Sequence, residues 1–192
     1  ETYMPVCSSL YKPNEDLIKL YNNLNIAYLK NITEIETISL DEFSNNHRLE
    51  HIDFIKIDIQ GAELEVFEGI EEEKWNNIIG IEVEASFCDT YEDICLFPEV
   101  HTYLQGRDFS LIGLRPSYRF LRCSKSQQAK YKLDYGDVPN HTIMGKTNQA
   151  DCLYLKISKL EEYGISQVIR YLNIWPTECQ PYFLTRSQIG IL

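Results

Sequence analysis

Hydrophobic and polar residues follow a period of two in some parts of the chain and a helical period in others. Residues 52–59 (IDFIKIDI) and 78–85 (IIGIEVEA) have the apolar, β-branched character of buried strands. Residues 61–69 (GAELEVFEG) place their apolar side chains on one side and begin with acids, which predicts a helix. A strand therefore passes directly into a helix through a short turn at Gln60 and Gly61.

The same patterns predict the other elements. Leucines at helical spacing follow Pro13 and Asn14, and Ser39 with Glu42 has the spacing of a capping box. We expect further strands at 33–40, 109–115 and 151–157, helices at 14–24, 41–46 and 97–108, an irregular polar segment at 116–149, and a helix with an extended tail at 158–192.

Strands that alternate with helical stretches indicate βαβ units, and therefore an α/β fold with a mostly parallel sheet. The 192 residues, 44% of them apolar, suit one domain with a sizeable core. We place this domain at 1–157 and a helical and extended C-terminal appendage at 158–192.

Composition excludes some classes of function. The formal charge of −11 produces a surface that repels phosphate backbones, which argues against nucleic-acid binding. No apolar run approaches the length of a transmembrane helix, so we expect no membrane segment. The six cysteines form neither a C-x-x-C pair nor a Cys/His cluster, which favours reduced thiols in a cytoplasmic protein. The sequons at Asn31 and Asn140 have no secretory signal beside them, and we interpret both as chance.

Asp58 is the first candidate for a functional residue. Ligands of open parallel sheets bind beyond the carboxyl ends of the strands, and Asp58 ends its strand at that edge. Gly61 then lets the backbone pass close to a ligand or start the helix tightly. Asp58 therefore either projects into a ligand crevice or only caps the turn through backbone N–H groups.

Two further charges, Lys56 and Glu82, occur in the middle of predicted strands. A lone buried charge there is costly, so we predict that the two strands are neighbours and that these side chains form an ion pair. The alternative is that this face of the sheet is solvated.

Four segments, taken in order, resemble the second half of the FkbM-type S-adenosylmethionine-dependent methyltransferases. They are ETISLDEF, IDFIKIDIQGAELEVFEG, IIGIEVEASF and ADCLYLKI, and CSSLYKPN near the N-terminus resembles a segment of some members. The family's hallmark reads roughly K-[IL]-D-x-[EQ]-G-x-E, and it is matched by Lys56, Asp58, Gln60, Gly61 and Glu63. The resemblance covers about residues 5–157.

The resemblance implies a Rossmann-like methyltransferase domain with strand order 3-2-1-4-5-7-6 and one antiparallel strand. On that map the segments 33–40, 52–59, 78–84, 109–115 and 151–157 are the third to seventh strands. The implied cofactor is S-adenosylmethionine, and the implied methyl acceptor is a hydroxyl of a sugar or a natural product. The last strand, 151–157, is expected to be antiparallel to its neighbours.

The resemblance also suggests roles for individual residues. Asp58, Gln60 and Gly61 are expected at the methionine end of the cofactor. Asp58 is our first candidate for a catalytic base or positioning group, and Glu84 is the second. We expect no metal site; the alternative is magnesium bound by Asp58 with Glu84 or Asp89.

The chain departs from the family's pattern upstream of residue 33. The family's first strand carries a glycine-rich cofactor loop, and its second strand ends in an acid for the ribose hydroxyls, but no G-x-G occurs anywhere in this sequence. We therefore expect a sheet without its first two strands. The chain also opens on Glu1 rather than Met, so we expect it to be a piece of a longer polypeptide.

Two functions remain open at this point. One is O-methyl transfer from S-adenosylmethionine to a small-molecule or glycan acceptor, and the other is a truncated, non-catalytic methyltransferase-like module for interaction or structure. The oligomeric state is open, a homo-oligomer included. We expect this chain by itself to bind the cofactor weakly, because half of the cofactor crevice has no counterpart in it.

Overall fold

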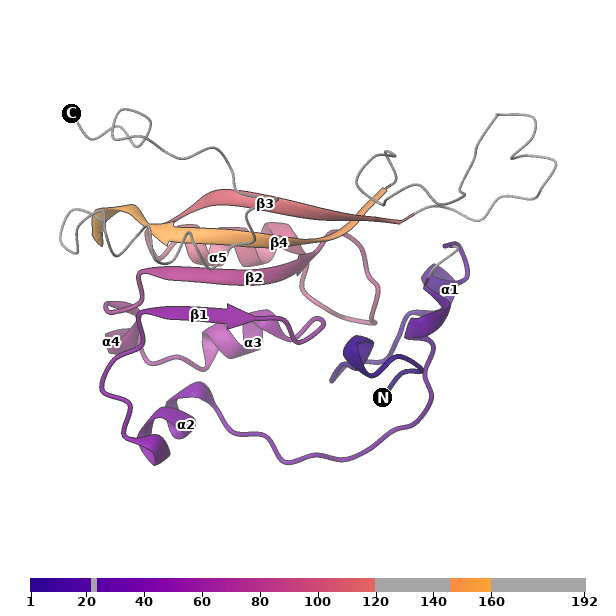
Figure 1. Cartoon of the computed structure of the whole chain (residues 1–192), viewed down its shortest axis with the longest axis horizontal. Coiled ribbons are helices and arrows are strands. Elements are labelled where there is room, and N and C mark those ends of the chain that lie inside the picture. The colour runs from indigo at the N-terminus through magenta and orange to yellow at the C-terminus, as the bar shows by residue number, and fades with distance from the viewer. Residues whose placement is uncertain (22–23, 120–145, 160–192) are drawn as a thin grey trace.

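The computed structural model of the chain describes residues 1–21, 24–119 and 146–159. A four-stranded sheet forms its centre, and the N-terminal segment lies at one end of that sheet (Figure 1). The strands are β1 (Phe54–Ile57), β2 (Gly80–Ser86), β3 (Phe109–Arg119) and β4 (Lys146–Lys156).

The strand order is β1-β2-β4-β3, as the resemblance implied for these four strands. β1 pairs with β2 in parallel, and β4 is antiparallel to both β2 and β3, which confirms the prediction for the last strand. The prediction of a mostly parallel sheet was wrong for the described strands, because two of the three pairings are antiparallel. The physical reason is that one reversed strand inside a sheet makes both of its own pairings antiparallel.

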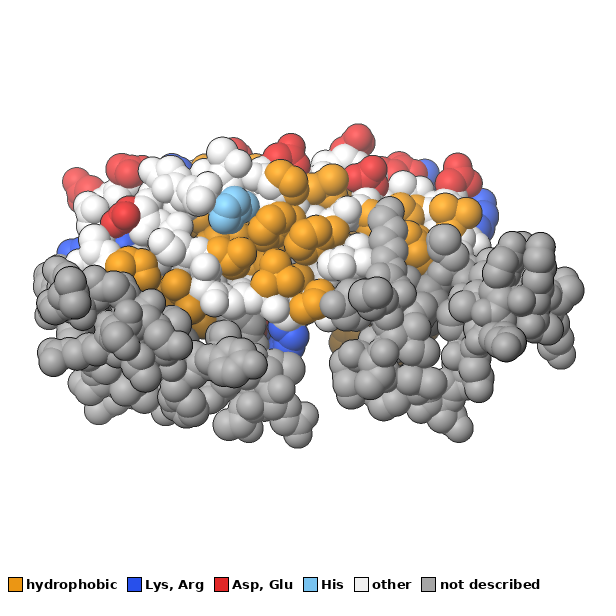
Figure 2. Space-filling view, turned by 90° about the horizontal axis from the view of Figure 1, so that it is seen from above, with side chains coloured by type: hydrophobic (Ala, Val, Ile, Leu, Met, Phe, Trp, Pro, Cys, Tyr) orange, Lys and Arg blue, Asp and Glu red, His pale blue; other side chains and the backbone are white. Residues whose placement is uncertain are grey.

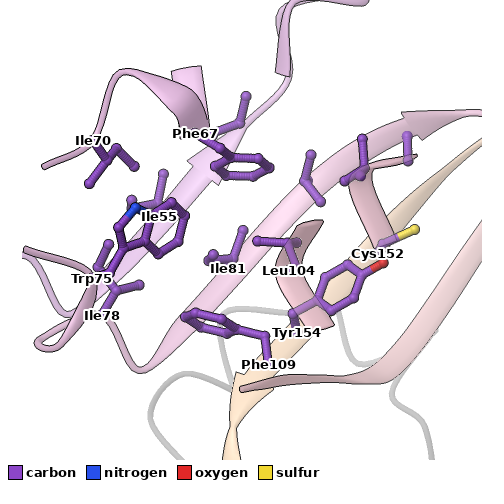
Figure 3. Close-up of a cluster of buried hydrophobic side chains, with 14 of the residues drawn as sticks. Ile55, Phe67, Ile70, Trp75, Ile78, Ile81, Leu104, Phe109, Cys152 and Tyr154 are labelled. Carbon is purple, nitrogen blue, oxygen red and sulfur yellow. The ribbon is translucent and has the colours of Figure 1, made fainter. Parts of the chain in front are cut away.

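The helices α3 (Glu63–Glu68), α4 (Glu72–Trp75) and α5 (Phe97–Gln105) cover one face of this sheet. Trp75 of α4 lies against Phe67 of α3 and meets Phe109 of β3 edge to face, with ring centroids 6.0 Å apart for the latter pair. Figure 3 shows these rings around Ile81 of β2, with Leu104 of α5 close to them. Full burial of each such side chain stabilises the fold by roughly 1.5–3 kcal/mol.

The margin of this core reaches the surface over β3 and α5, where apolar side chains gather in the space-filling view (Figure 2). Phe87 and Phe97 stack there with ring centroids 4.7 Å apart, and both are only partly buried. The opposite face of the sheet is different, because β1, β2 and β4 place charged and amide side chains on it.

On that opposite face, Lys56 and Glu82 lie directly across from each other in the register of β1 and β2. The Lys56 ammonium is 2.5 Å from the Glu82 carboxylate, which confirms the predicted ion pair. Burial lowers the pKa of Lys56, but the hydrogen bond and the charge of Glu82 outweigh it and raise the pKa above its ordinary value. Glu82 is buried while Lys56 is half exposed, so the lysine reaches in from solvent to neutralise the acid.

The helix α2 (Leu40–His47) begins where the capping-box spacing predicted it. The Ser39 hydroxyl accepts a hydrogen bond from the backbone N–H of Glu42. Asp41 then accepts hydrogen bonds from the backbone N–H of Glu71, at 2.7 Å, and from the ammonium of Lys74, at 2.6 Å. One buried carboxylate therefore holds α2 against the start of α4.

The N-terminal segment is less helical than its pattern suggested. Asn14 caps α1 (Glu15–Ile18) as expected, but the helix ends after four residues instead of reaching residue 24. Leu20, one of the leucines at helical spacing, is 54% exposed. Ile18 and Tyr21 are buried in its place, together with Leu24 and with Ala27 of the short 3-10 helix η2 (Asn25–Ala27). A second 3-10 helix, η1, spans Pro5–Cys7.

The predicted strand at 33–40 was wrong. Residues 33–39 pair with no strand of the described chain, and Ile35 and Ile38 are 64% and 53% exposed. Alternating residues form a strand only where a neighbouring strand accepts their backbone hydrogen bonds, and the segment has no such neighbour in the described chain.

The predicted irregular segment at 116–149 was partly wrong, because β3 extends to Arg119 and β4 begins at Lys146. The positions 120–145 and 160–192, with most of the predicted appendage, lie outside the described residues.

Cys95 and Cys152 are free thiols, and Cys123 and Cys179 lie outside the described residues. None of the helices in the described ranges combines the length and the apolar character that crossing a bilayer requires.

The buried position of Glu82 generates a stability prediction. Lys56→Met removes the cation and leaves a buried carboxylate, so we expect the free energy of unfolding to fall by about 1–3 kcal/mol in urea titrations at pH 7. The matched control is Lys12→Met, which breaks the exposed pair with Glu92 and should cost less than about 1 kcal/mol. The double variant Lys56→Met/Glu82→Met should regain stability relative to Lys56→Met. Additive losses in the double variant would show that the two charges are not coupled.

Candidate functional site

The candidate site lies beyond the ends of β1 and β2 that point toward the N-terminal segment (Figure 1). Asp58 follows the last residue of β1, and Glu84 stands near the end of β2. Because these two strands are parallel, their carboxyl ends meet at the same edge of the sheet. The structure thus brings together the two carboxylates that the sequence analysis named as candidate catalytic groups.

The turn after β1 has an unusual backbone. Gln60 has a φ of 60° and Gly61 a φ of 117°, both in the region that side chains disfavour. The carboxylate of Glu63, a buried residue, accepts hydrogen bonds from the backbone N–H groups of Gly61, at 3.0 Å, and Ile59, at 3.3 Å. The turn is therefore capped by Glu63, which leaves the Asp58 carboxylate available at the surface.

Gly61 is confined by its neighbours as well as by its conformation. A Cβ atom on this residue would lie 2.5 Å from Cγ2 of Ile94. The carbonyl of Gln60 also accepts a 2.6 Å hydrogen bond from the hydroxyl of Ser9, which ties the N-terminal segment to the turn. Gly61 thus serves close packing at the turn, which is one of the two roles that the sequence suggested for it.

A side-chain amide joins the two carboxylates. Nε2 of Gln60 donates to Oδ1 of Asp58 at 3.0 Å and to Oε2 of Glu84 at 2.7 Å. The other oxygen of Glu84 accepts a hydrogen bond from the amide of Gln149 on β4. Oε1 of Gln60 faces the hydroxyl of Tyr91 at 3.2 Å. We call these five residues, Asp58, Gln60, Glu84, Tyr91 and Gln149, the carboxylate–amide cluster.

The environment of Glu84 shifts its titration. Burial and the neighbouring charge of Asp58 raise the pKa of Glu84 to about 7, although the hydrogen bonds from Gln149 and Gln60 favour the ionised form. Asp151 on β4 also raises the pKa of Glu84 and is itself paired with Arg115, whose Nε lies 2.8 Å from its carboxylate. A carboxyl with a pKa near neutrality can accept or release a proton under ordinary conditions.

The amide and hydroxyl partners were not foreseen from the sequence. Tyr91, Gln149 and Ser9 are 31, 89 and 51 residues from Gln60, and none belongs to a short motif around it. One relevant signal was the segment CSSLYKPN, which contains Ser9 and resembles a segment of some family members. The geometry adds that this segment touches the turn after β1.

In the residues that the structure describes, no group of three or more His, Cys, Asp or Glu side chains is placed so that it could hold a metal ion. The cluster can accept a proton, orient a hydroxyl and attract a positive charge. Asp58 is the exposed member through which a ligand would be met.

The crowded turn predicts a strong effect of one methyl group. Gly61→Ala should lower the free energy of unfolding by about 2–4 kcal/mol, because the added Cβ meets Ile94 and the positive φ disfavours a side chain. The matched control is Gly106→Ala after α5, where φ is −62° and a Cβ meets only carbonyl oxygens at 3.5 Å. Thermal and urea unfolding compare the two variants, and equal effects would contradict the proposed crowding.

The raised pKa of Glu84 predicts that stability depends on pH. The folded chain binds this proton more tightly than the unfolded chain, so stability is lost as the pH rises from about 4.5 through 7. Relative to Glu84→Gln, the wild-type chain should lose up to about 3 kcal/mol over this range. Urea titrations at pH 4.5, 6 and 8 measure the difference, with Glu34→Gln in the exposed segment as control. A difference that stays constant with pH would contradict the assignment.

Comparison with known proteins places this geometry in a family. Residues 14–111 match the model of the methyltransferase FkbM domain, and these residues include Asp58, Gln60, Glu84 and Tyr91. The chain is 30% identical over 83 residues to Methyltransferase sdnD of Sordaria araneosa, which covers 43% of this chain and 30% of that protein. It is 28% identical over 121 residues to Methyltransferase 1 of Beauveria bassiana, which covers 60% of this chain and 47% of that protein.

The chain thus spans less than half the length of either curated relative. No solved structure matches it. The family model covers just over half of the chain and includes both candidate carboxylates, so the chain belongs to the FkbM methyltransferase domain family.

Proposed function

We propose that the chain forms the part of an S-adenosylmethionine-dependent O-methyltransferase that holds the reacting groups. The observation that carries this proposal is the carboxylate–amide cluster at the carboxyl ends of two parallel strands, built on the hallmark of the family. Membership of the family supports methyl transfer, while the cofactor and the acceptor atom are what the resemblance to the family implies, and the chemistry of the cluster suits both.

The cluster suits a cationic methyl donor. S-adenosylmethionine supplies a methyl group on a positively charged sulfur, which is activated toward attack by an oxygen. The Asp58 carboxylate is exposed, and Glu84 lies one amide away from it, so this edge of the sheet attracts positive charge.

The cluster also suits a hydroxyl acceptor. Transfer of a methyl group to a hydroxyl oxygen releases the hydroxyl proton, which needs a base within hydrogen-bond reach. Asp58 is the carboxylate that can meet the hydroxyl, and the raised pKa of Glu84 makes the pair able to take up a proton near neutrality. Gln60 keeps the two carboxylates at a fixed separation, so the base is already positioned before the acceptor hydroxyl binds.

The resemblance to the family implies an acceptor hydroxyl on a small molecule or a glycan. The overall charge of −11 agrees with such an acceptor, because it disfavours nucleic acids and other polyanions.

A second function is favoured by one sequence observation. The chain contains no G-x-G, which methyltransferases of this type use to hold the cofactor. A non-catalytic, methyltransferase-like interaction module would keep the fold and the ion pairs without binding the cofactor. The two candidates differ in what Asp58 does, since only the enzyme needs this carboxylate at the methyl donor.

We therefore predict a preference for the charged form of the cofactor. In calorimetric titrations the chain should bind S-adenosylmethionine weakly, with a dissociation constant above about 10 μM, and up to about tenfold more tightly than S-adenosylhomocysteine. Asp58→Asn should abolish the preference. The matched control, Asp53→Asn, changes an exposed acid just before β1 at its opposite end and should preserve it.

Three outcomes would contradict this expectation. Absence of binding to either molecule at millimolar concentration would favour the non-catalytic module. A preference that survives Asp58→Asn would remove Asp58 from the methyl donor. A dissociation constant at or below about 10 μM would show that other residues of the chain supply the cradle that the missing glycine loop forms elsewhere.

A further inference from the structure

The contacts of Tyr91 extend the proposed function, on which this inference rests. Tyr91 lies in the loop after β2 and is buried. Its hydroxyl is 2.5 Å from the carbonyl of Cys7 and 3.2 Å from Oε1 of Gln60. No short motif of the sequence includes it, and the proposed chemistry does not use it directly.

The charges around Gln60 require one orientation of its amide. The nitrogen faces Asp58 and Glu84, and ionised carboxylates only accept hydrogen bonds. When both carboxylates are ionised, an amide turned by 180° would leave its oxygen facing two acceptors. In the observed orientation Oε1 of Gln60 accepts from the hydroxyl of Tyr91, and this contact favours that orientation.

The hydroxyl of Tyr91 is kept in its donating form. Burial raises the pKa of Tyr91, and the neighbouring carboxylates Glu84, Glu63 and Asp58 raise it further. The phenol therefore keeps its single proton at neutral pH, and the carbonyl oxygen of Cys7, at 2.5 Å, and Oε1 of Gln60, at 3.2 Å, share it. The hydroxyl of Tyr91 thus contacts both the N-terminal segment, through Cys7, and the side-chain amide of Gln60.

We propose that Tyr91 is a positioning residue, whose hydroxyl fixes the side-chain amide of Gln60 in the orientation that bridges Asp58 and Glu84. The backbone assists, because the hydroxyl of Ser9 holds the Gln60 carbonyl at 2.6 Å and residues Pro13 and Tyr91 form an antiparallel bridge. The N-terminal segment is in this way part of the device that aligns the carboxylate pair.

The test is Tyr91→Phe, which removes the hydroxyl and keeps the ring. The matched control is Tyr103→Phe, because the hydroxyl of Tyr103 also donates to a carbonyl, that of Phe67 at 3.1 Å, but lies within the helical face of the core. Two readouts by nuclear magnetic resonance report the cluster itself: the titration of the Glu84 carboxyl carbon and hydrogen exchange of the Gln60 side-chain amide. A loss of general stability would not move these two signals in a chain that remains folded.

In Tyr91→Phe the amide loses its fixed orientation, and Glu84 loses a hydrogen bond that favours its ionised form. We expect the titration midpoint of Glu84 to rise by about half a pH unit or more and the Gln60 amide protons to exchange faster. The charged or titratable groups that face Glu84 are Asp58, Asp151 with its partner Arg115, Cys152 and Tyr91 itself, and only the last changes. Tyr103→Phe should match the wild-type chain in both signals.

The inference would be overturned if both signals in Tyr91→Phe equalled those of the wild-type chain and of Tyr103→Phe. Should Tyr91→Phe fail to fold, Ser9→Ala provides a second variant, since it releases the same turn from the N-terminal segment and should also speed exchange of the Gln60 amide. Neither readout uses the cofactor or an acceptor. A failure to bind S-adenosylmethionine would therefore count against the proposed function and leave this inference unaffected.

Discussion

The parallel register of β1 on β2 is the constraint on which the rest of the site depends. It sets Lys56 opposite Glu82, and this ion pair tolerates no shift of one residue, since such a shift would turn the charges toward the helices. Two residues further along the same face stand Asp58 and Glu84. The pairing that neutralises one buried acid therefore also fixes the distance across which Gln60 bridges Asp58 and Glu84.

The reversed strand β4 completes this arrangement from the other side. It lies beside β2 and opposes Glu84 with Asp151, while Gln149 two residues earlier reaches the second oxygen of Glu84. Arg115 of β3 neutralises Asp151 across the next ladder. Acids on this face are thus matched with a lysine, an arginine or an amide, and the carboxylate at the surface is Asp58. The opposite face has no such requirement and is filled by rings and branched side chains.

Sequence patterns predicted what depends on local periodicity and failed where a distant partner decides. The strand, turn and helix around Gln60 were predicted because a buried strand, two turn residues and an acidic first turn are local signals. The Lys56–Glu82 pair was predicted because burying a single charge is costly. The segment 33–39 was mistaken for a strand because alternation says nothing about the neighbour that must accept its hydrogen bonds. Tyr91 and Gln149 were missed for a related reason, since the role of an isolated amide or phenol depends on the group that it faces in the folded chain.

The hydrogen bonds that tie the N-terminal segment to the site have a consequence for how the chain folds. Ser9 and Gln60 are separated by 51 residues, and Cys7 and Tyr91 by 84. Closing loops of this length costs chain entropy before any contact rewards it, whereas the turn from β1 into α3 forms among near neighbours. The unit of β1, α3 and β2 can therefore assemble first, since its two strands pair across only 26 residues (Lys56 with Glu82), with Asp58 and Glu84 already side by side. The hydrogen bonds from the N-terminal segment form as a late step of folding. They are also the first of these contacts to break when the chain fluctuates.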